Sequence, residues 1–181
     1  LGNGAGAWLQ NLNFAVFGLL LLCFAAAFRR GMRSLMGRKA LLLTTGLLAL
    51  SAIGFIAAAY FRVPDPNAPE SIRFRQGMLH GLSFMTIFVP LIVALLLTGS
   101  QMLRNLAWRA MGWYSFVTAA IAIVLIALIT QFADPSSSVP IGGLLTRLLV
   151  VQTFAWHVGI GWHLLRGGLC RCGRSCSGEP T

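Results

Sequence analysis

The sequence has 181 residues, of which 57% are hydrophobic and only 10% are charged, and its formal net charge is +10. This balance leaves too little polar surface for a water-soluble globule, so it excludes an ordinary soluble domain. The Lys and Arg residues lie in short clusters between long apolar runs and not along one polar face, which argues against a nucleic-acid partner. Anionic lipid headgroups at the cytoplasmic membrane face are the expected partner instead.

Five apolar stretches approach the ~20 residues that a helix needs to cross the hydrocarbon of a bilayer. Backbone groups in such runs must be satisfied locally, and the runs lack the alternation of barrel strands. We therefore expect an all-α fold: a polytopic transmembrane helix bundle at residues 1–168, followed by a disordered cytoplasmic tail at residues 169–181. Gly54 and Ala58 form a pair of small residues suited to close helix packing. The spans are expected at about residues 8–28, 40–61, 78–103, 110–132 and 143–165.

The distribution of cations predicts the orientation in the membrane, because cytoplasmic connections carry an excess of Lys and Arg. The connections after the first and third spans and the tail hold Arg29, Arg30, Arg33, Arg38, Lys39, Arg104, Arg109, Arg166, Arg171 and Arg174. We expect a multi-pass protein of the plasma membrane with its visible N-terminus outside and its C-terminus in the cytoplasm. The chain opens with Leu1 and not with Met, and an outside start normally needs a preceding helix. A first helix is therefore expected to be missing from this sequence.

Several short motifs occur in a fixed order along the chain. They are Gly6–Phe14 with Phe17–Leu19, Pro64–Pro66, Gly77–His80, Tyr114–Ser115 and Gly142–Leu148. Together, over about residues 6–165, they resemble the domain of unknown function family 998. The resemblance implies a six-helix prokaryotic membrane protein seen without its first helix, and it implies no activity. Two stretches depart from the family pattern, namely the basic residues 71–75 and the Cys-rich tail from Leu169 onward.

Polar side chains near the outer ends of the spans form the first candidate site. Such side chains are costly inside a bilayer, by ~2.5–3.5 kcal/mol, so each is a functional candidate. Gln10 and Asn13 share a helix face, His80 and Arg147 open the third and last spans, and Asp65 lies in a connection beside them. If the helices close into a bundle, these five residues are expected to form an outward ligand pocket. The alternative is ordinary packing, with Arg147 paired to a loop carboxylate and the amides joining helices.

Polar residues near the middle of the last span form a second candidate site. His157 lies there with Thr153 four residues earlier, and Gln152 lies four residues before Trp156. A midplane imidazole is suited to proton transfer or substrate binding in a transporter. The alternative is a neutral histidine that hydrogen-bonds a neighbouring helix.

No catalytic, cofactor or metal site is predicted. His157 and His163 lie six residues apart, ~9 Å along a helix and ~240° around it, so they cannot bind one haem from opposite sides. The chain has no HExxH, GxSxG or P-loop motif. Cys170, Cys172 and Cys176 lack a fourth zinc ligand, and a disordered tail explains them better than a metal site.

The function predicted from these observations is non-enzymatic. We expect an integral membrane protein that binds lipid or a small ligand, senses it, or scaffolds other membrane proteins. Homo-oligomers and complexes with other membrane proteins are compatible with such a bundle. Two alternatives stay open: a small-molecule transporter with its site near His157, and a lipid-modifying enzyme that uses the outer polar residues.

Overall fold

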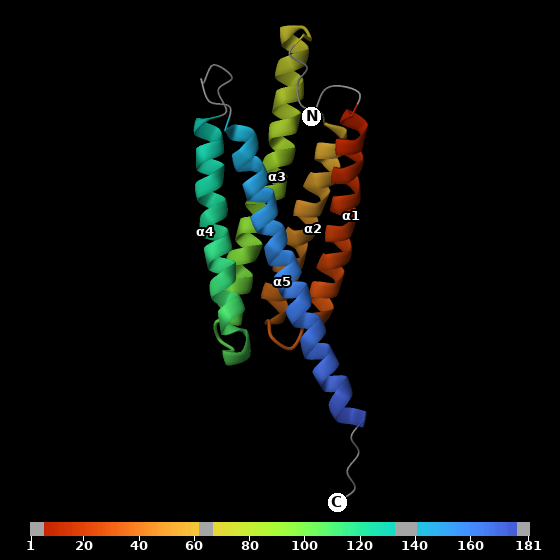
Figure 1. Ribbon diagram of the computed structural model, residues 1–181, viewed down its shortest axis with the longest axis vertical. Coiled ribbons are helices and arrows are strands. Elements are labelled where there is room, and N and C mark those ends of the chain that lie inside the picture. The colour runs from red at the N-terminus through yellow and green to blue at the C-terminus, as the bar shows by residue number, and fades with distance from the viewer. Residues whose placement is uncertain (1–5, 62–66, 133–140, 177–181) are drawn as a thin grey trace, which may run out of the picture. The chain divides into compact units, whose positions relative to one another are not determined.

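The computed structural model describes residues 6–61, 67–132 and 141–176, with side chains described up to residue 166. Within these ranges all regular structure is helical, and five helices are long and apolar enough to cross a membrane (Figure 1). This confirms the predicted all-α transmembrane fold. The elements are α1 (Ala7–Gly31), α2 (Arg38–Tyr60), α3 (Glu70–Met102), the short 3₁₀ helix η1 (Leu106–Trp108), α4 (Arg109–Gln131) and α5 (Gly142–Cys176).

The chain forms two compact units. The first, residues 1–98, contains α1, α2 and most of α3. The second, residues 99–181, contains the end of α3, η1, α4 and α5. Each unit has packing contacts of its own, so each is described by itself.

The backbones of α1 and α2 meet at a glycine of α1. A Cβ atom added to Gly18 would lie 2.8 Å from the carbonyl oxygen of Ala52 and 2.6 Å from Cγ1 of Ile56. Only a residue without a side chain fits this approach. Small residues let helices approach closely in membranes, where van der Waals packing replaces hydrophobic burial as the main driving force.

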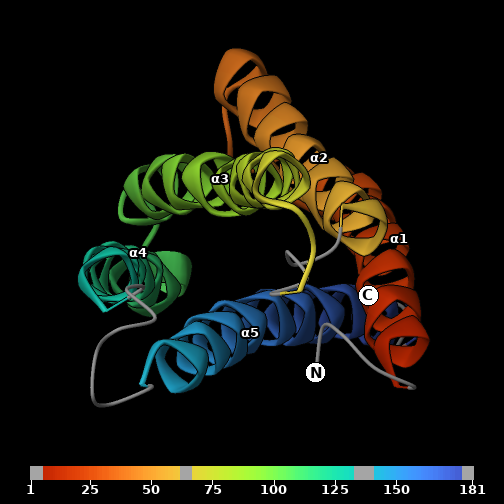
Figure 2. The same ribbon diagram turned by 90° about the horizontal axis from the view of Figure 1, so that it is seen from above.

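The other side of α2 approaches α3 in the same way. A Cβ atom added to Gly54 would lie 2.8 Å from the backbone nitrogen of Ile87. Gly54 is two residues from Ala52, about 200° around the helix, so α1 and α3 lie on opposite sides of α2 (Figure 2). The predicted close packing at Gly54 is confirmed by this contact.

Aromatic rings fill the space along these two contacts. Phe55 of α2 lies edge-on to Phe17 of α1, with ring centroids 5.1 Å apart, and to Phe88 of α3, at 6.4 Å. Phe55 and Phe88 are both buried. Aromatic pairs of this geometry contribute about 0.5–1.5 kcal/mol beyond their buried area. The three helices of the first unit therefore share one core centred on α2.

Helix α3 begins well before the span that the sequence predicts. Its first residue is Glu70, although the apolar run starts only at Met78. Pro69 precedes the first turn and accepts backbone hydrogen bonds from Ile72 and Arg73, and an acidic residue in that turn complements the helix dipole. The 33 residues of α3 extend about 50 Å, so the helix is longer than ~30 Å of hydrocarbon.

In the second unit, α4 and α5 pack side by side. Gly159 of α5 lies against Met111 of α4, because a Cβ atom there would be 3.3 Å from the methionine Cε. Nearer the ends of these helices, the ring of Trp108 lies edge-on to the imidazole of His163, with centroids 4.3 Å apart. These two contacts are one helical turn apart and join α5 to the start of α4 and to the preceding η1.

The last helix extends beyond its predicted span. It continues to Cys176, although residues 169–181 were expected to form a disordered tail. Extending an existing helix is easier than starting a new one, because the costly nucleus is already formed. Residues 177–181 lie outside the described part of the chain.

The Gly54 contact gives a direct test of the first unit. Gly54→Ala places a methyl group against the backbone of α3, so we expect a loss of about 1–3 kcal/mol in stability. Gly46→Ala is the matched control on the same helix, because nothing lies within 4 Å of a Cβ atom there. Thermal unfolding in detergent should show a lower midpoint for Gly54→Ala only. Equal midpoints for the two variants would contradict this packing.

Candidate functional site

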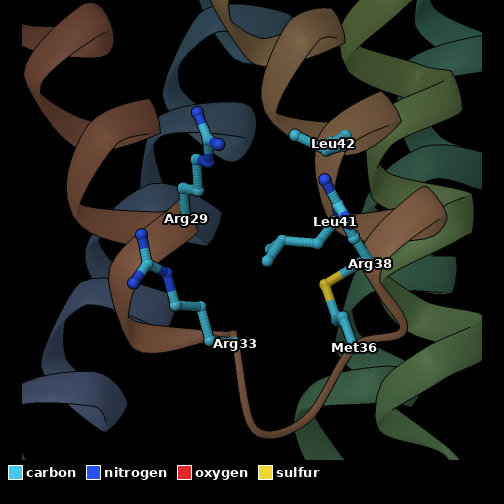
Figure 3. Close-up of a pocket in the computed structure, with 6 residues that line it drawn as sticks. All are labelled: Arg29, Arg33, Met36, Arg38, Leu41 and Leu42. Atoms are coloured by element: carbon cyan, nitrogen blue, oxygen red, sulfur yellow. The ribbon is translucent and has the colours of Figure 1, made fainter.

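A cavity opens at the end of the first unit where α1 passes into α2. Its volume is about 360 Å³. Figure 3 shows Arg29 and Arg33 on the α1 side, other residues on the α2 side, and the turn between the helices below. The complete lining consists of Arg29, Arg33, Met36, Arg38, Leu41 and Leu42. Three arginines and three apolar residues therefore border one small space.

The turn between α1 and α2, which borders the cavity, is fixed by backbone hydrogen bonds and by buried side chains. The backbone nitrogen of Met32 donates to the carbonyl of Phe28 at 2.9 Å, and that of Met36 donates to the carbonyl of Met32 at 3.0 Å. Both methionine side chains are buried, at 0% and 4% exposure. Because the apolar side chains of the turn point into the core, its polar neighbours remain outside. Arg33 and Arg38 are accordingly exposed.

Within the described ranges, no acidic side chain lies beside the arginines of the cavity. Among the residues that the structure describes, the only carboxylate is Glu70, which begins α3 at the opposite end of the first unit. Helix α2 starts at the cavity with Gly37 as its N-cap, and no side chain caps it. Backbone N–H groups at a helix N-terminus favour anions. The arginines and the N-terminus of α2 are therefore groups of positive charge at the same place.

The basic residues here were predicted to lie at the cytoplasmic face, but the sequence did not single out a cavity among them. One signal was present: Arg29 and Arg33 are only four residues apart in the sequence. The five-residue gap from Arg33 to Arg38 is spanned by a tight turn. Which cations line the cavity depends on the folded turn, so spacing alone does not identify them.

The predicted outer residues of the first unit lie on two of its helices. Gln10 is half-buried and Asn13 is exposed, both on α1. His80 of α3 is 2.9 Å, through Nδ1, from the carbonyl oxygen of Phe61, which ends α2. Since a carbonyl only accepts, Nδ1 is the donor in this bond. His80 therefore joins α2 to α3, and Asp65 lies outside the described residues.

Arg147, the fifth member of the predicted outer pocket, belongs to the second unit. It lies in the early part of α5 and its side chain is exposed. The other members with described side chains belong to the first unit. Convergence of these residues on one ligand pocket stays a prediction.

The predicted midplane residues lie on α5, and two of them bond to their own helix. His157 Nδ1 donates to the carbonyl of Thr153 at 2.8 Å, and the Thr153 hydroxyl is 2.9 Å from the carbonyl of Leu149. Gln152 is half-buried, and its Nε2 atom has no hydrogen-bond partner among the described residues. His157 is also edge-on to Trp156, at 5.0 Å. The role of these residues in transport stays a prediction.

One buried polar contact was not expected from the sequence. The indole nitrogen of Trp156 donates to the hydroxyl oxygen of Ser115 at 2.8 Å, and that hydroxyl donates to the carbonyl of Met111, also at 2.8 Å. Trp156 and Ser115 are fully buried. This chain of bonds joins α5 to α4 within the apolar part of both helices. Across the described residues, no group of three His, Cys, Asp or Glu side chains is placed to hold a metal ion.

Comparison with known proteins gives one match. A family model described as "Protein of unknown function (DUF998)" matches residues 1–163. A search of curated proteins found no match, and neither did a search of solved structures. The match covers most of the chain, and its description carries no activity.

The Trp156–Ser115 bond can be tested by removing its acceptor. Ser115→Ala deprives the buried indole N–H of this acceptor, so we expect the free energy of unfolding to fall by about 0.6–2 kcal/mol. Ser83→Ala is the matched control: Ser83 is also buried, but its hydroxyl bonds to Leu79 on its own helix. Thermal unfolding in detergent, with tryptophan fluorescence as the signal, should detect the larger loss in Ser115→Ala. An equal or smaller loss there would show that the bond does not hold α5 to α4.

Proposed function

The chain belongs to the DUF998 family of proteins of unknown function, and for this member we propose a non-enzymatic role as a membrane helix bundle that binds anionic lipid. The binding site is the basic cavity between α1 and α2. One observation carries the proposal: three arginines and an apolar wall line the same space. Such a lining suits a molecule that is charged at one end and apolar at the other.

The position of the cavity along the helices supports a lipid. The apolar run of α2 begins at Ala40, so Arg38 precedes the run while Leu41 and Leu42 belong to it. The cavity therefore lies at the level where headgroups meet hydrocarbon. In the orientation predicted from the cations, this level is the cytoplasmic leaflet, whose anionic lipids attract basic side chains near the surface.

The polar residues elsewhere support this choice over transport or catalysis. A transporter uses polar groups at the midplane to contact a substrate, whereas His157 and Thr153 bond to carbonyls of their own helix. A lipid-modifying enzyme needs a set of catalytic groups, and the sequence has no HExxH, GxSxG or P-loop motif. The basic cavity needs no residue beyond those that line it.

Two double variants test the proposal with equal changes of charge. Arg29→Gln/Arg38→Gln removes two cations that line the cavity, and each contributes about 1 kcal/mol to anionic lipid binding. We expect binding of phosphatidylglycerol to weaken about 10–30-fold. Native mass spectrometry of the purified protein, titrated with phosphatidylglycerol or phosphatidylcholine, measures this change.

The control removes two neighbouring cations on the same segments. Arg30→Gln/Lys39→Gln alters charges that flank the cavity without lining it. We expect the binding of phosphatidylglycerol to weaken less than about threefold, because charges on the surface are screened by salt. Equal losses in both double variants would reject the cavity as the binding site. Equal binding of the two lipids by the wild type would reject the proposed function itself.

A further inference from the structure

We infer that the cavity between α1 and α2 selects a lipid phosphomonoester, a glycerophospholipid whose phosphate carries no head alcohol. This inference rests on the proposed function and names the class of lipid that the same site takes. The observations behind it are the number of cations, the free start of α2 and the size of the cavity.

The number of cations favours a ligand with more than one negative charge. Three arginines line the cavity, and the only described carboxylate, Glu70, lies at the far end of the first unit. A phosphodiester headgroup such as that of phosphatidylglycerol brings one negative charge. A phosphomonoester brings about 1.5–2 at neutral pH, as phosphorylated side chains do. The doubly charged group therefore removes more of the repulsion among Arg29, Arg33 and Arg38.

The donors around the cavity also match the oxygens of a monoester. Each guanidinium presents a planar set of N–H donors that suits phosphate oxygens. A monoester has three terminal oxygens, whereas a diester has two. The three arginines come from the end of α1 (Arg29), the turn that follows it (Arg33) and the first residue of α2 (Arg38) (Figure 3). Arg29 and Arg38 thus offer N–H donors from opposite sides of the cavity (Figure 3).

The first turn of α2 adds donors at the same place. Gly37 makes no side-chain cap, and the first turn contains no acidic residue. Instead, Arg38 and Lys39 occupy the first two positions of the helix. Cations there are unfavourable for an isolated helix, because the N-terminus already carries positive partial charge. An anion bound at the N-terminus of α2 offsets this unfavourable interaction between like charges.

The size and wall of the cavity favour a lipid over free phosphate. A volume of about 360 Å³ is near the lower end of small-ligand sites, so it holds a headgroup and not a whole lipid. Leu42 lines the cavity and is also 44% exposed on the outside of α2. An acyl chain leaving the cavity past Leu42 continues along the apolar surface of the helix. The occupant is thus held by its phosphate and anchored by the bilayer.

Three lipids with identical dioleoyl chains separate the charge of the phosphate from its size. Phosphatidic acid is the monoester, phosphatidylmethanol adds only a methyl group to make the diester, and phosphatidylcholine carries no net charge. Native mass spectrometry of the full chain at neutral pH measures the binding of each. We expect phosphatidic acid to bind roughly tenfold more tightly than phosphatidylmethanol, because one more negative charge faces the arginines.

Single variants assign this preference to the cavity. Arg33→Gln should reduce the preference for phosphatidic acid over phosphatidylmethanol to less than about threefold. Arg30→Gln, which alters a cation outside the lining, should keep it. Retention of the full preference in Arg33→Gln would overturn the inference. If the Arg33 variant does not fold, the comparison of the three lipids on the wild type still tests the preference for the monoester.

A soluble competitor distinguishes the lipid from a free phosphate compound. sn-Glycerol 3-phosphate carries the same monoester without acyl chains, so we expect it to leave bound phosphatidic acid in place at equal concentration. Full displacement would overturn the assignment to a lipid. Equal binding of phosphatidic acid and phosphatidylmethanol, both above phosphatidylcholine, would overturn the monoester while leaving the proposed function intact. Equal binding of all three lipids would reject both.

Discussion

The turn between α1 and α2 is the constraint on which the cavity depends. Its two methionines, Met32 and Met36, are buried in the first unit, and full burial of each contributes about 1.5–3 kcal/mol. Backbone hydrogen bonds within residues 28–36 close the turn. The Gly18 contact then keeps the two helices together above it. Apolar packing and a close backbone approach thus bring cations into one small space, although the cations repel one another.

This arrangement is not the one that would make the isolated protein most stable. Arg29 at the end of α1 complements the helix dipole, but Arg38 at the start of α2 opposes it. A ligand that binds only the folded state adds stability in proportion to the logarithm of its concentration. An anion bound in the cavity, as proposed, would therefore offset an unfavourable electrostatic interaction at the start of α2.

The apolar runs were sufficient to predict the fold, because length and hydropathy decide whether a segment spans a bilayer. Helices α2 and α4 begin and end within two residues of the predicted spans. Helix α3 begins eight residues before its predicted span because its first turns are helical without being apolar, and hydropathy does not detect such turns. The cavity was harder to predict. The sequence places Arg30 and Arg33 in one basic cluster, and only the folded turn determines that Arg33 lines the cavity and Arg30 does not.

The polar side chains of this protein differ in whether their hydrogen-bonding groups have partners within the protein. The indole N–H of Trp156 bonds to a hydroxyl 41 positions earlier in the sequence, a partner that helical periodicity cannot reveal. The His157 N–H bonds to the carbonyl of its own helix four residues back, which is one way for an apolar helix to carry a polar side chain. By contrast, none of the three arginines around the cavity has a hydrogen bond or ion pair within the described chain. A cost of burial alone therefore does not distinguish a ligand site from a packing device, because a buried polar group that bonds to its own helix or to a neighbouring helix is already accommodated by the fold.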